Sequence, residues 1–270
     1  MDENNINAEK KIALCFTISY DHVLIKEKLW REWIEPNRDI INVYFFYKNF
    51  TKIKSDWIKE HCIPAKYIRA TSYYHVIPAY ISLMRHGLDA DQTNQWFCFL
   101  TDSCCPLISP AKFRDLFLSN SGKSIMKWSK ADWNIRFHQR ANLRFLKANY
   151  HLKNDPWFTL TREHAMYCLE TMKSNMKLTD LICSGGLANE SLFAIILYKQ
   201  PDVINASSHL TDWSRMTSAT SPYVFSRWSN DSAFILAELE ANPFLMFIRK
   251  VTVDFSPLDI LNADPEVGVL

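Results

Sequence analysis

The pattern that most restricts the fold is an alternation of short apolar runs with longer segments of helical periodicity. The runs "KIALCFTIS" (11–19), "INVYFFYKN" (41–49) and "QWFCFLTDSCCPL" (95–107) are rich in aliphatic and aromatic residues, which is typical of buried strands. Between them, residues 22–34 and 79–88 repeat apolar residues at helical spacing. Because a continuously apolar strand needs cover on both faces, this order predicts an α/β fold with a mostly parallel central sheet flanked by helices.

Polar residues follow each predicted strand at its carboxyl end. The first run ends in "TISY", the second in "FYKN" and the third in "TDSCCPL", where Pro106 should stop further regular structure. Ligands of open parallel sheets bind outside the carboxyl ends of the strands. We therefore expect these three turns to form the rim of a binding site.

Composition and charge favour a single globular domain. Residues 1–11 read as a polar tail, and residues 12–270, in a chain that is 48% hydrophobic, as one domain. The first apolar run is far shorter than the roughly 20 residues that a membrane span needs. A net charge of +2 gives no reason to expect a nucleic-acid partner. Residues 127–153 are rich in Lys, Arg, His and Trp with weak periodicity, which indicates an excursion over the surface.

The cysteines favour a reducing compartment. Their number, seven, is odd, and Cys104 and Cys105 are adjacent, which suits reduced thiols in the cytoplasm better than a disulfide framework. Either of these two thiols could in principle be a nucleophile, but free cysteines are usually core residues.

Metal-binding spacings are missing from the expected places. An Asp-x-Asp pair directly after a buried strand could hold a cation and a diphosphate, but Asp89-Ala90-Asp91 precedes the third strand and reads as a solvated loop. The acid at the strand end is a single one, Asp102, and His and Cys residues lack zinc spacing. We therefore expect no metal.

The segment "CSGGLANESLFAIILY" (183–198) joins a glycine pair to an apolar helical pattern. Asn189 is predicted to cap the helix, and Gly185 and Gly186 could let the backbone approach a substrate closely. One carboxylate, Glu190, stands at the helix start. It could act as a general base, or it could only complement the helix dipole.

Seven segments in the same order resemble the core-2/I-branching β-1,6-N-acetylglucosaminyltransferase family, especially its plant-type members. They are "IALCFTIS", "FCFLTDSCCPL", "DPWFTLTREHA", "ANESLFAIIL", "TDWSR", "SPYVFSR" and "FLMFIRKVTVD". The resemblance extends from about Ile12 to Asp254. It implies a GT-A-like fold, inverting transfer of a sugar from a UDP-sugar donor to a hydroxyl of a glycan or other acceptor, and no need for a divalent cation. The resemblance implies GlcNAc, or the sugar of a related UDP-sugar, as the group that is transferred.

The resemblance also implies roles for individual residues. Glu190 falls on the family's general base, which suffices for an inverting displacement because no carboxylate nucleophile is needed. The departing diphosphate then needs fixed cations, and Lys250 and Arg227 fall on the family's lysine and arginine, with Arg249 as the rival of Lys250. The donor is expected at Thr17, Ser19, Tyr74, Asp102 and Ser103. The acceptor is expected at Trp157, Trp213, Arg215, Gly185 and Gly186.

Departures from the family leave its finer properties open. Asn154-Asp155-Pro156 replaces a Gly-Ser before Trp157, and Met216-Thr217 replaces a Gly-Gly after Arg215, which affects the acceptor and sugar preference. A xylosyl or glucosyl transferase of the same fold, and a catalytically inactive glycan- or nucleotide-sugar-binding module, are the alternatives. An unrelated α/β enzyme with a cysteine nucleophile is a third.

Overall fold

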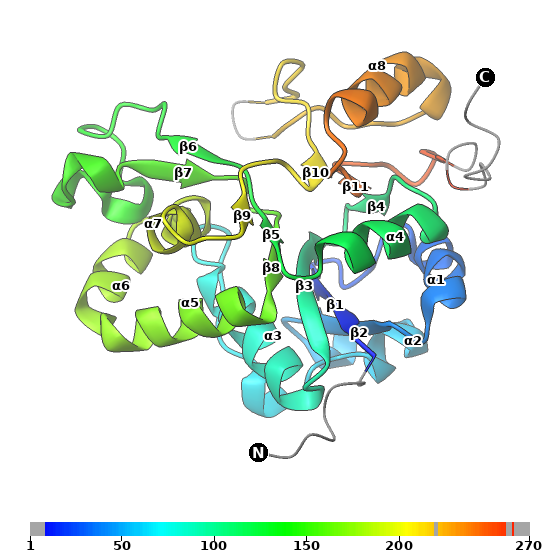
Figure 1. Ribbon diagram of the computed structural model, residues 1–270, viewed down its shortest axis with the longest axis horizontal. Coiled ribbons are helices and arrows are strands. Elements are labelled where there is room, and N and C mark those ends of the chain that lie inside the picture. Colours follow the sequence, from blue (N-terminus) through cyan, green and yellow to red (C-terminus); the bar gives the residue numbers. More distant parts are fainter. Residues whose placement is uncertain (1–8, 219–220, 258–260, 262–270) are drawn as a thin grey trace.

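The chain is built around one six-stranded sheet (Figure 1) in the computed structural model, which describes residues 9–218, 221–257 and 261. The strands run in the order β2 (Ile41–Phe46), β1 (Lys11–Thr17), β3 (Asn94–Thr101), β8 (Thr159–Thr161), β5 (Ser124–Ile125) and β9 (Val203–Ile204). β1 pairs in parallel with β2 and β3, and β5 pairs in parallel with β9, whereas β8 is antiparallel to both neighbours. The predicted α/β class and mostly parallel sheet are confirmed.

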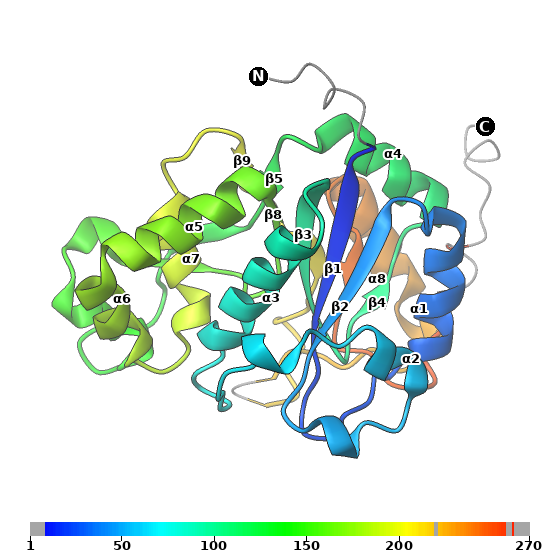
Figure 2. The ribbon, with the colours of Figure 1, turned by 90° about the horizontal axis from the view of Figure 1, so that it is seen from below.

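Helices lie on both faces of this sheet. Figure 2 shows the two groups, which are α3 (Ile77–Ala90) and α5 (Arg162–Ser174) on one side, and α1 (Glu27–Ile34) and α4 (Pro110–Asn120) on the other. Side chains of β1 alternate between them, with Ile12, Leu14 and Phe16 in the core under α1 and α4 and Ala13 and Cys15 in the core under α3 and α5. Burial on both faces explains why β1 is apolar from Ile12 to Phe16.

Shorter elements complete the fold. The remaining α-helices are α2 (Asp56–Glu60), α6 (Met176–Cys183), α7 (Leu192–Leu197) and α8 (Trp228–Ala241). The 3₁₀ turns are η2 (Glu35–Asn37), η3 (Phe50–Lys52), η4 (Ala65–Tyr67), η5 (Arg140–Phe145), η6 (Ala148–Tyr150) and η7 (Ala188–Glu190). In the described part of the chain no single helix is long and apolar enough to cross a bilayer, and α6 with Ala188–Leu197 reaches that length and composition only across a bend of 109°.

Two predicted boundaries are wrong. The helical pattern of residues 22–34 begins as a helix only at Glu27, because His22 takes a left-handed φ of 56° and the residues before Glu27 form a loop. Pro106 does not end regular structure. It lies in β4 (Cys105–Pro106), which pairs with β11 (Phe247–Ile248), and β11 in turn pairs with β10 (His209–Leu210). Because β11 pairs with β4, the residues that follow β11 lie next to the end of β3.

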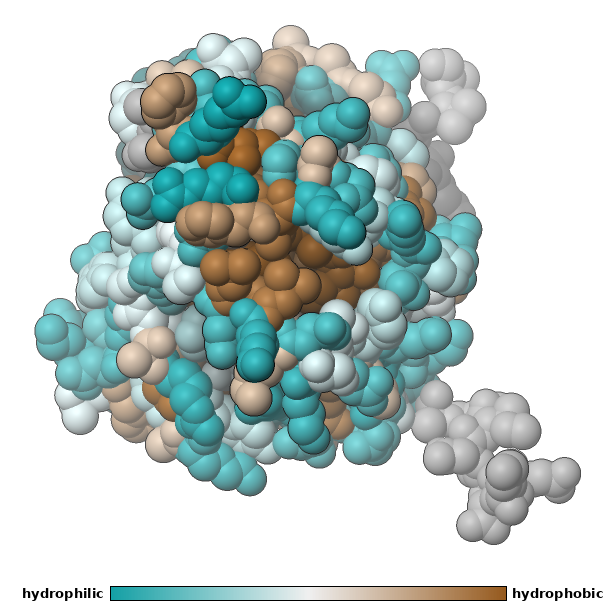
Figure 3. All heavy atoms as spheres, turned by 90° about the vertical axis from the view of Figure 1, so that its left-hand side faces the viewer, coloured by the Kyte–Doolittle hydropathy of each residue, from teal (hydrophilic) through white to brown (hydrophobic). Residues whose placement is uncertain are grey.

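The cation-rich segment of residues 127–153 is the surface excursion that the sequence predicts. Strands β6 (Trp128–Lys130) and β7 (Leu152–Asn154) form a hairpin, and η5 and η6 lie between them. Figure 1 shows this segment, which we call the arm, at the same end of the molecule as α6. Figure 3 shows that end as an apolar hollow surrounded by hydrophilic side chains.

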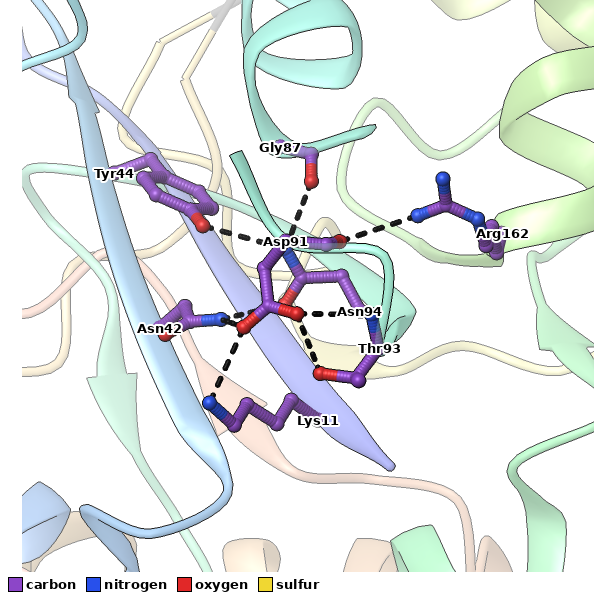
Figure 4. A network of polar contacts seen from close by, with 8 residues as sticks. All are labelled: Lys11, Asn42, Tyr44, Gly87, Asp91, Thr93, Asn94 and Arg162. Carbon is purple, nitrogen blue, oxygen red and sulfur yellow. Dashed lines mark hydrogen bonds and ion pairs between the residues drawn. The ribbon is translucent and has the colours of Figure 1, made fainter. Parts of the chain in front are cut away.

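Asp91 has a structural role at the opposite, amino-terminal end of the strands (Figure 4). Its carboxylate accepts hydrogen bonds from Lys11 Nζ (3.2 Å), Asn42 Nδ2 (3.0 Å) and Thr93 Oγ1 (2.6 Å). Its backbone oxygen accepts one from Arg162 Nη1 (3.2 Å). Asp91 lies in a loop as predicted, but its carboxylate is hydrogen-bonded rather than solvated and joins β1, β2, the end of α3 and the start of α5, whereas Asp89 and Ala90 belong to α3.

Candidate active site

A cavity of about 560 Å³ lies at the carboxyl ends of β1, β2 and β3. All three predicted turns contribute to it, with Thr17 and Ser19 after β1, Lys48 after β2, and Asp102 and Ser103 after β3. Side chains from later in the chain complete its lining, namely Trp157, Glu190, Trp213, Arg249 and Lys250. A second cavity of about 580 Å³ lies outside the edge strand β2 and contains none of the predicted site residues.

Hydrogen bonds hold the turns after β1 and β3 together. Asp102 Oδ2 accepts the backbone N–H of Ser19 at 2.9 Å, and the carbonyl oxygen of Asp102 accepts the N–H of Ile25 at 3.0 Å. Thr101 Oγ1 and Ser103 Oγ lie 3.3 Å apart. The single strand-end acid thus fixes the loop that runs from β1 to α1.

Cys104 and Cys105 lie below this turn and are fully buried. Burial raises the pKa of both thiols above the ordinary value. A nucleophilic cysteine needs exposure and a lowered pKa, so the geometry disfavours the cysteine-nucleophile hypothesis. All seven cysteines of the chain are free.

Arg249 lies almost completely inside the protein at the base of the cavity, with 7% of its surface exposed. Its guanidinium stacks on the Trp157 ring at 3.5 Å from the ring centroid, and Nη2 is 3.5 Å from Ser103 Oγ. Its Nε atom is buried without a hydrogen-bond partner among the described residues. Burial lowers the pKa of Arg249 because it disfavours the charged guanidinium. No carboxylate in the described part of the chain forms an ion pair with this side chain.

Lys250 adds a second cation beside Arg249. Its Nζ donates to Ser221 Oγ at 3.2 Å, and burial followed by the neighbouring Arg249 charge lowers its pKa. Two adjacent cations that make no ion pair with the described carboxylates are costly in a partly desolvated cavity. The arrangement can recover this cost when an anion binds, because charge-assisted hydrogen bonds to a phosphate are strong.

Glu190 lines the same cavity at the end of η7, two residues before the start of α7. About a quarter of its side chain is exposed, and Oε2 is 3.7 Å from Arg140 Nη1 of the arm. Burial raises the pKa of Glu190, and the charges of Arg140 and Lys153 oppose that rise. The result is a partly buried carboxylate with a raised proton affinity that still opens into the cavity, which suits a general base.

Asn189 is not the helix cap that the sequence predicts. It lies inside η7, and Ser191 occupies the position before α7 without making a side-chain cap bond. The turn is fixed by Asn154 instead, whose Nδ2 donates to the Asn189 carbonyl at 2.9 Å and whose Oδ1 accepts the Ala194 N–H at 3.1 Å. Asn154 stands where the family pattern has Gly-Ser, so this departure supports the Glu190 backbone directly.

The two glycines before Glu190 contact protein rather than the cavity. A Cβ on Gly185 would lie 2.4 Å from the backbone nitrogen of Asn142, and one on Gly186 would lie 3.5 Å from the Tyr74 ring. Neither glycine lines the cavity. The expectation that they admit a substrate is therefore replaced by a packing role, in which Gly185 lets the chain after α6 pass close to η5.

Three other predicted residues lie outside the cavity lining. Tyr74 is half exposed and its neighbour Tyr73 takes its place in the lining. Arg227 is exposed before α8, and Arg215 binds Asp212 and Asp231 at the rim. The family pattern that points to Arg227 fixes a position along the chain but not the direction of the side chain, and Arg249 is the arginine that lines the cavity together with Lys250.

The cavity lining also contains Tyr80, which the sequence did not indicate, and Lys48, which was predicted only as part of the "FYKN" turn. Tyr80 of α3 lies beneath it and donates from its hydroxyl to the Pro156 carbonyl. Lys48 Nζ lies 3.9 Å from the Tyr20 ring centroid and donates to the Thr71 carbonyl at 3.1 Å. Lys48 stands in the "FYKN" turn, so its position at a strand end was a usable signal. Tyr80 lies in the middle of a helical pattern, where nothing distinguishes it from a core residue.

Metal ligands do not gather here. Across the part of the chain that the structure describes, no three His, Cys, Asp or Glu side chains converge in a way that could hold an ion.

Comparison with known protein families gives the site its context. The family model of the Core-2/I-Branching enzyme matches residues 41–232, more than two thirds of the chain. No curated protein matches the chain. The matched span includes Asp102, Trp157 and Glu190 and ends before Arg249. The chain therefore belongs to the Core-2/I-branching enzyme family, a family of glycosyltransferases that use UDP-sugar donors.

Proposed function

We propose that this glycosyltransferase transfers GlcNAc from UDP-GlcNAc, with inversion and without a divalent metal ion, to a hydroxyl of a glycan or glycoconjugate. One observation carries the proposal. A cavity at the strand ends contains two cations without carboxylate partners, Arg249 and Lys250, together with a carboxylate of raised pKa, Glu190. An inverting transfer requires the protein to stabilise the leaving diphosphate and to remove the proton of the acceptor hydroxyl.

The proposed reaction is a single displacement. Glu190 takes the proton of the acceptor hydroxyl, the acceptor oxygen forms a bond to C1 of the sugar, and the bond from C1 to the diphosphate oxygen breaks. The electron pair of that bond leaves with UDP, and Arg249 and Lys250 stabilise the added negative charge on the diphosphate. Trp157 stacks on Arg249 and holds its guanidinium at the cavity floor.

Fixed cations support the metal-independent part of the proposal. A Mn²⁺ or Mg²⁺ ion in other transferases would supply the charge that Arg249 and Lys250 supply here. Arg227, which the sequence favoured for this task, has no part in the proposal because its side chain is exposed outside the lining.

UDP release in EDTA, with UDP-GlcNAc and a panel of glycan acceptors, tests the function. Wild-type protein should release UDP without added metal, and Glu190→Gln should lower turnover by about 100-fold to 10,000-fold while UDP binding persists. Lys250→Met should lower turnover by about 100-fold to 1,000-fold. Arg227→Gln removes a cation outside the cavity and should leave turnover unchanged.

Three outcomes would contradict the proposal. Complete dependence on Mn²⁺ would remove the leaving-group role of the two cations. Full activity of Glu190→Gln would remove the base. Calorimetric binding of UDP-GlcNAc without turnover on any acceptor would favour the inactive binding module, and UDP-xylose or UDP-glucose as the preferred donor would replace GlcNAc.

A further inference from the structure

The arm concentrates positive charge to a degree that the whole chain hides. Residues 127–153 contain seven Lys and Arg and one Asp, so the arm has a formal charge of +6, whereas the remaining 24 Lys and Arg and 28 Asp and Glu give −4. The single acid, Asp132, is paired with Lys153. Five of the cations are exposed and form no ion pair within the described residues, namely Lys127, Lys130, Arg136, Arg144 and Lys147.

Exposed apolar side chains accompany this charge. Phe137 is 83% exposed and Phe145 is 59% exposed on the arm, while Met176 and Leu178 of α6 are 65% and 43% exposed. The arm and α6 are joined, since Asn142 Nδ2 of η5 donates to the Leu181 carbonyl of α6 at 2.8 Å. Figure 3 shows the same end of the molecule, where an apolar hollow is surrounded by hydrophilic side chains. Such a combination marks an interaction site.

We propose that this face, formed by the arm and the start of α6, docks on an anionic lipid surface. Positive charge is complementary to acidic headgroups, and each Lys or Arg near such a surface adds to the affinity. The apolar side chains can enter the boundary between headgroups and acyl chains while the cations stay among the headgroups. Lys173 and Lys177 flank Met176 on the α6 side and extend the same pattern.

The apolar members favour a lipid surface over an acidic polysaccharide. An anionic glycan would use cations and aromatic faces, but it would gain nothing from Met176 and Leu178, whose aliphatic surface is removed from water only by another apolar phase. Arg144 lies 4.7 Å from the Phe145 ring centroid, which places a cation and a large apolar group at the same point of the face. Membrane-interface segments combine groups in this way.

Docking would place the candidate site near the lipid surface. Arg140 of the arm lies 3.7 Å from Glu190, so the arm borders the side of the cavity at which a proton acceptor faces the substrate. The inference does not depend on the proposed function, because binding to vesicles is measured on the full chain without a donor or an acceptor.

Co-sedimentation with vesicles tests the proposal. The protein should bind vesicles of phosphatidylcholine and phosphatidylserine, bind phosphatidylcholine vesicles far more weakly, and be released by high salt. The triple substitution Arg136→Gln, Arg144→Gln, Lys147→Gln should weaken binding on the order of a hundredfold, since each cation contributes about fivefold. Lys52→Gln, Lys54→Gln, Lys112→Gln removes three exposed cations elsewhere and should leave binding within about twofold.

A second pair of variants tests the apolar part. Phe145→Ser with Met176→Ser should weaken vesicle binding by at least about tenfold at unchanged charge, whereas Leu118→Ser with Leu236→Ser, at sites of similar exposure, should not. Equal binding to neutral and acidic vesicles would overturn the proposal. Binding to an acidic polysaccharide but not to vesicles would also overturn it, and so would a dimer in solution that the Phe145 and Met176 pair dissociates.

Discussion

Gly185 provides the sharpest test of how the chain positions Glu190. A methyl group in the Gly185→Ala variant would lie 2.4 Å from Asn142 N, 2.7 Å from Gln139 O and 2.8 Å from Ala141 C. All three are backbone atoms, so no flexible side chain can move aside. Ordinary contact begins at 3.4 Å, and η5 would have to separate from the end of α6 by up to about 1 Å.

The cost follows from two opposing effects. Overpacking a rigid contact costs about 1–3 kcal/mol, and replacing Gly by Ala recovers about 0.4–1 kcal/mol by restricting the unfolded chain. We expect a net loss of about 1–2 kcal/mol, which corresponds to a fall in melting temperature of about 2–4 °C for a chain of this size. The strain also reaches Arg140, the first residue of η5, and so should lower turnover.

Two other glycines provide matched controls. A Cβ on Gly122 would meet nothing within 4 Å, so Gly122→Ala should be neutral or slightly stabilising, and one on Gly186 would make only an ordinary contact with Tyr74. Thermal unfolding and urea titration measure all three variants under the same conditions. If Gly185→Ala were as stable as Gly122→Ala, the close approach of α6 to η5 would not constrain the site, and the packing role assigned to Gly185 would fail.

Two further predictions concern pH. Burial by itself would raise the pKa of Asp91, but hydrogen bonds from Thr93, Asn42 and Lys11 outweigh burial and leave the pKa well below the ordinary value. The ionised carboxylate therefore stabilises the fold above about pH 4. This stabilisation is lost as the pH falls through the folded-state pKa of Asp91. By urea unfolding, Asp91→Asn should cost about 2 kcal/mol near neutral pH, and a difference that stayed constant in acid would contradict the charge-based account. Arg140→Gln should raise the pKa of Glu190 and move the acidic limb of the kcat/KM profile to higher pH. Because a partly exposed ion pair contributes about 1 kcal/mol, activity on that limb should fall by about fivefold. An unchanged acidic limb, or the same shift in the Arg144→Gln variant, would be evidence against the pairing of Arg140 with Glu190.

Patterns that report burial predicted the strands well. The residues of β1 had to be apolar on both faces, and the polar turns at the ends of β1, β2 and β3 had to meet at one edge, so the rim of the cavity could be predicted from the sequence. The start of α1 could not. Residues 22–26 keep the apolar periodicity of a helix although His22 takes a left-handed backbone conformation, and periodicity does not report backbone angles.

The direction of a side chain was the main quantity that the sequence left undetermined. Arg227 and Arg249 are both arginines near an aromatic run, and only the tertiary structure shows that Arg249 turns inward under Trp157 while Arg227 stays exposed. The same limit applies to the glycine pair, because a requirement for a small residue does not say whether a ligand or another strand of backbone lies beside it. Here η5 lies beside Gly185.

The arm links these corrections to one another. Gly185 allows η5 to approach the end of α6, Arg140 at the start of η5 reaches Glu190, and Asn154 at the end of β7 fixes the backbone on both sides of Glu190. The candidate base is therefore held by Asn154 and by the arm, a segment that the sequence identifies only as a surface excursion. Since the same segment carries +6 charges and exposed aromatic residues, any partner that binds the arm acts next to the carboxylate that is proposed to deprotonate the acceptor. Binding at the arm should for that reason change the acidic limb of the activity profile together with the affinity for the acceptor, whereas a contact at α8 should change neither.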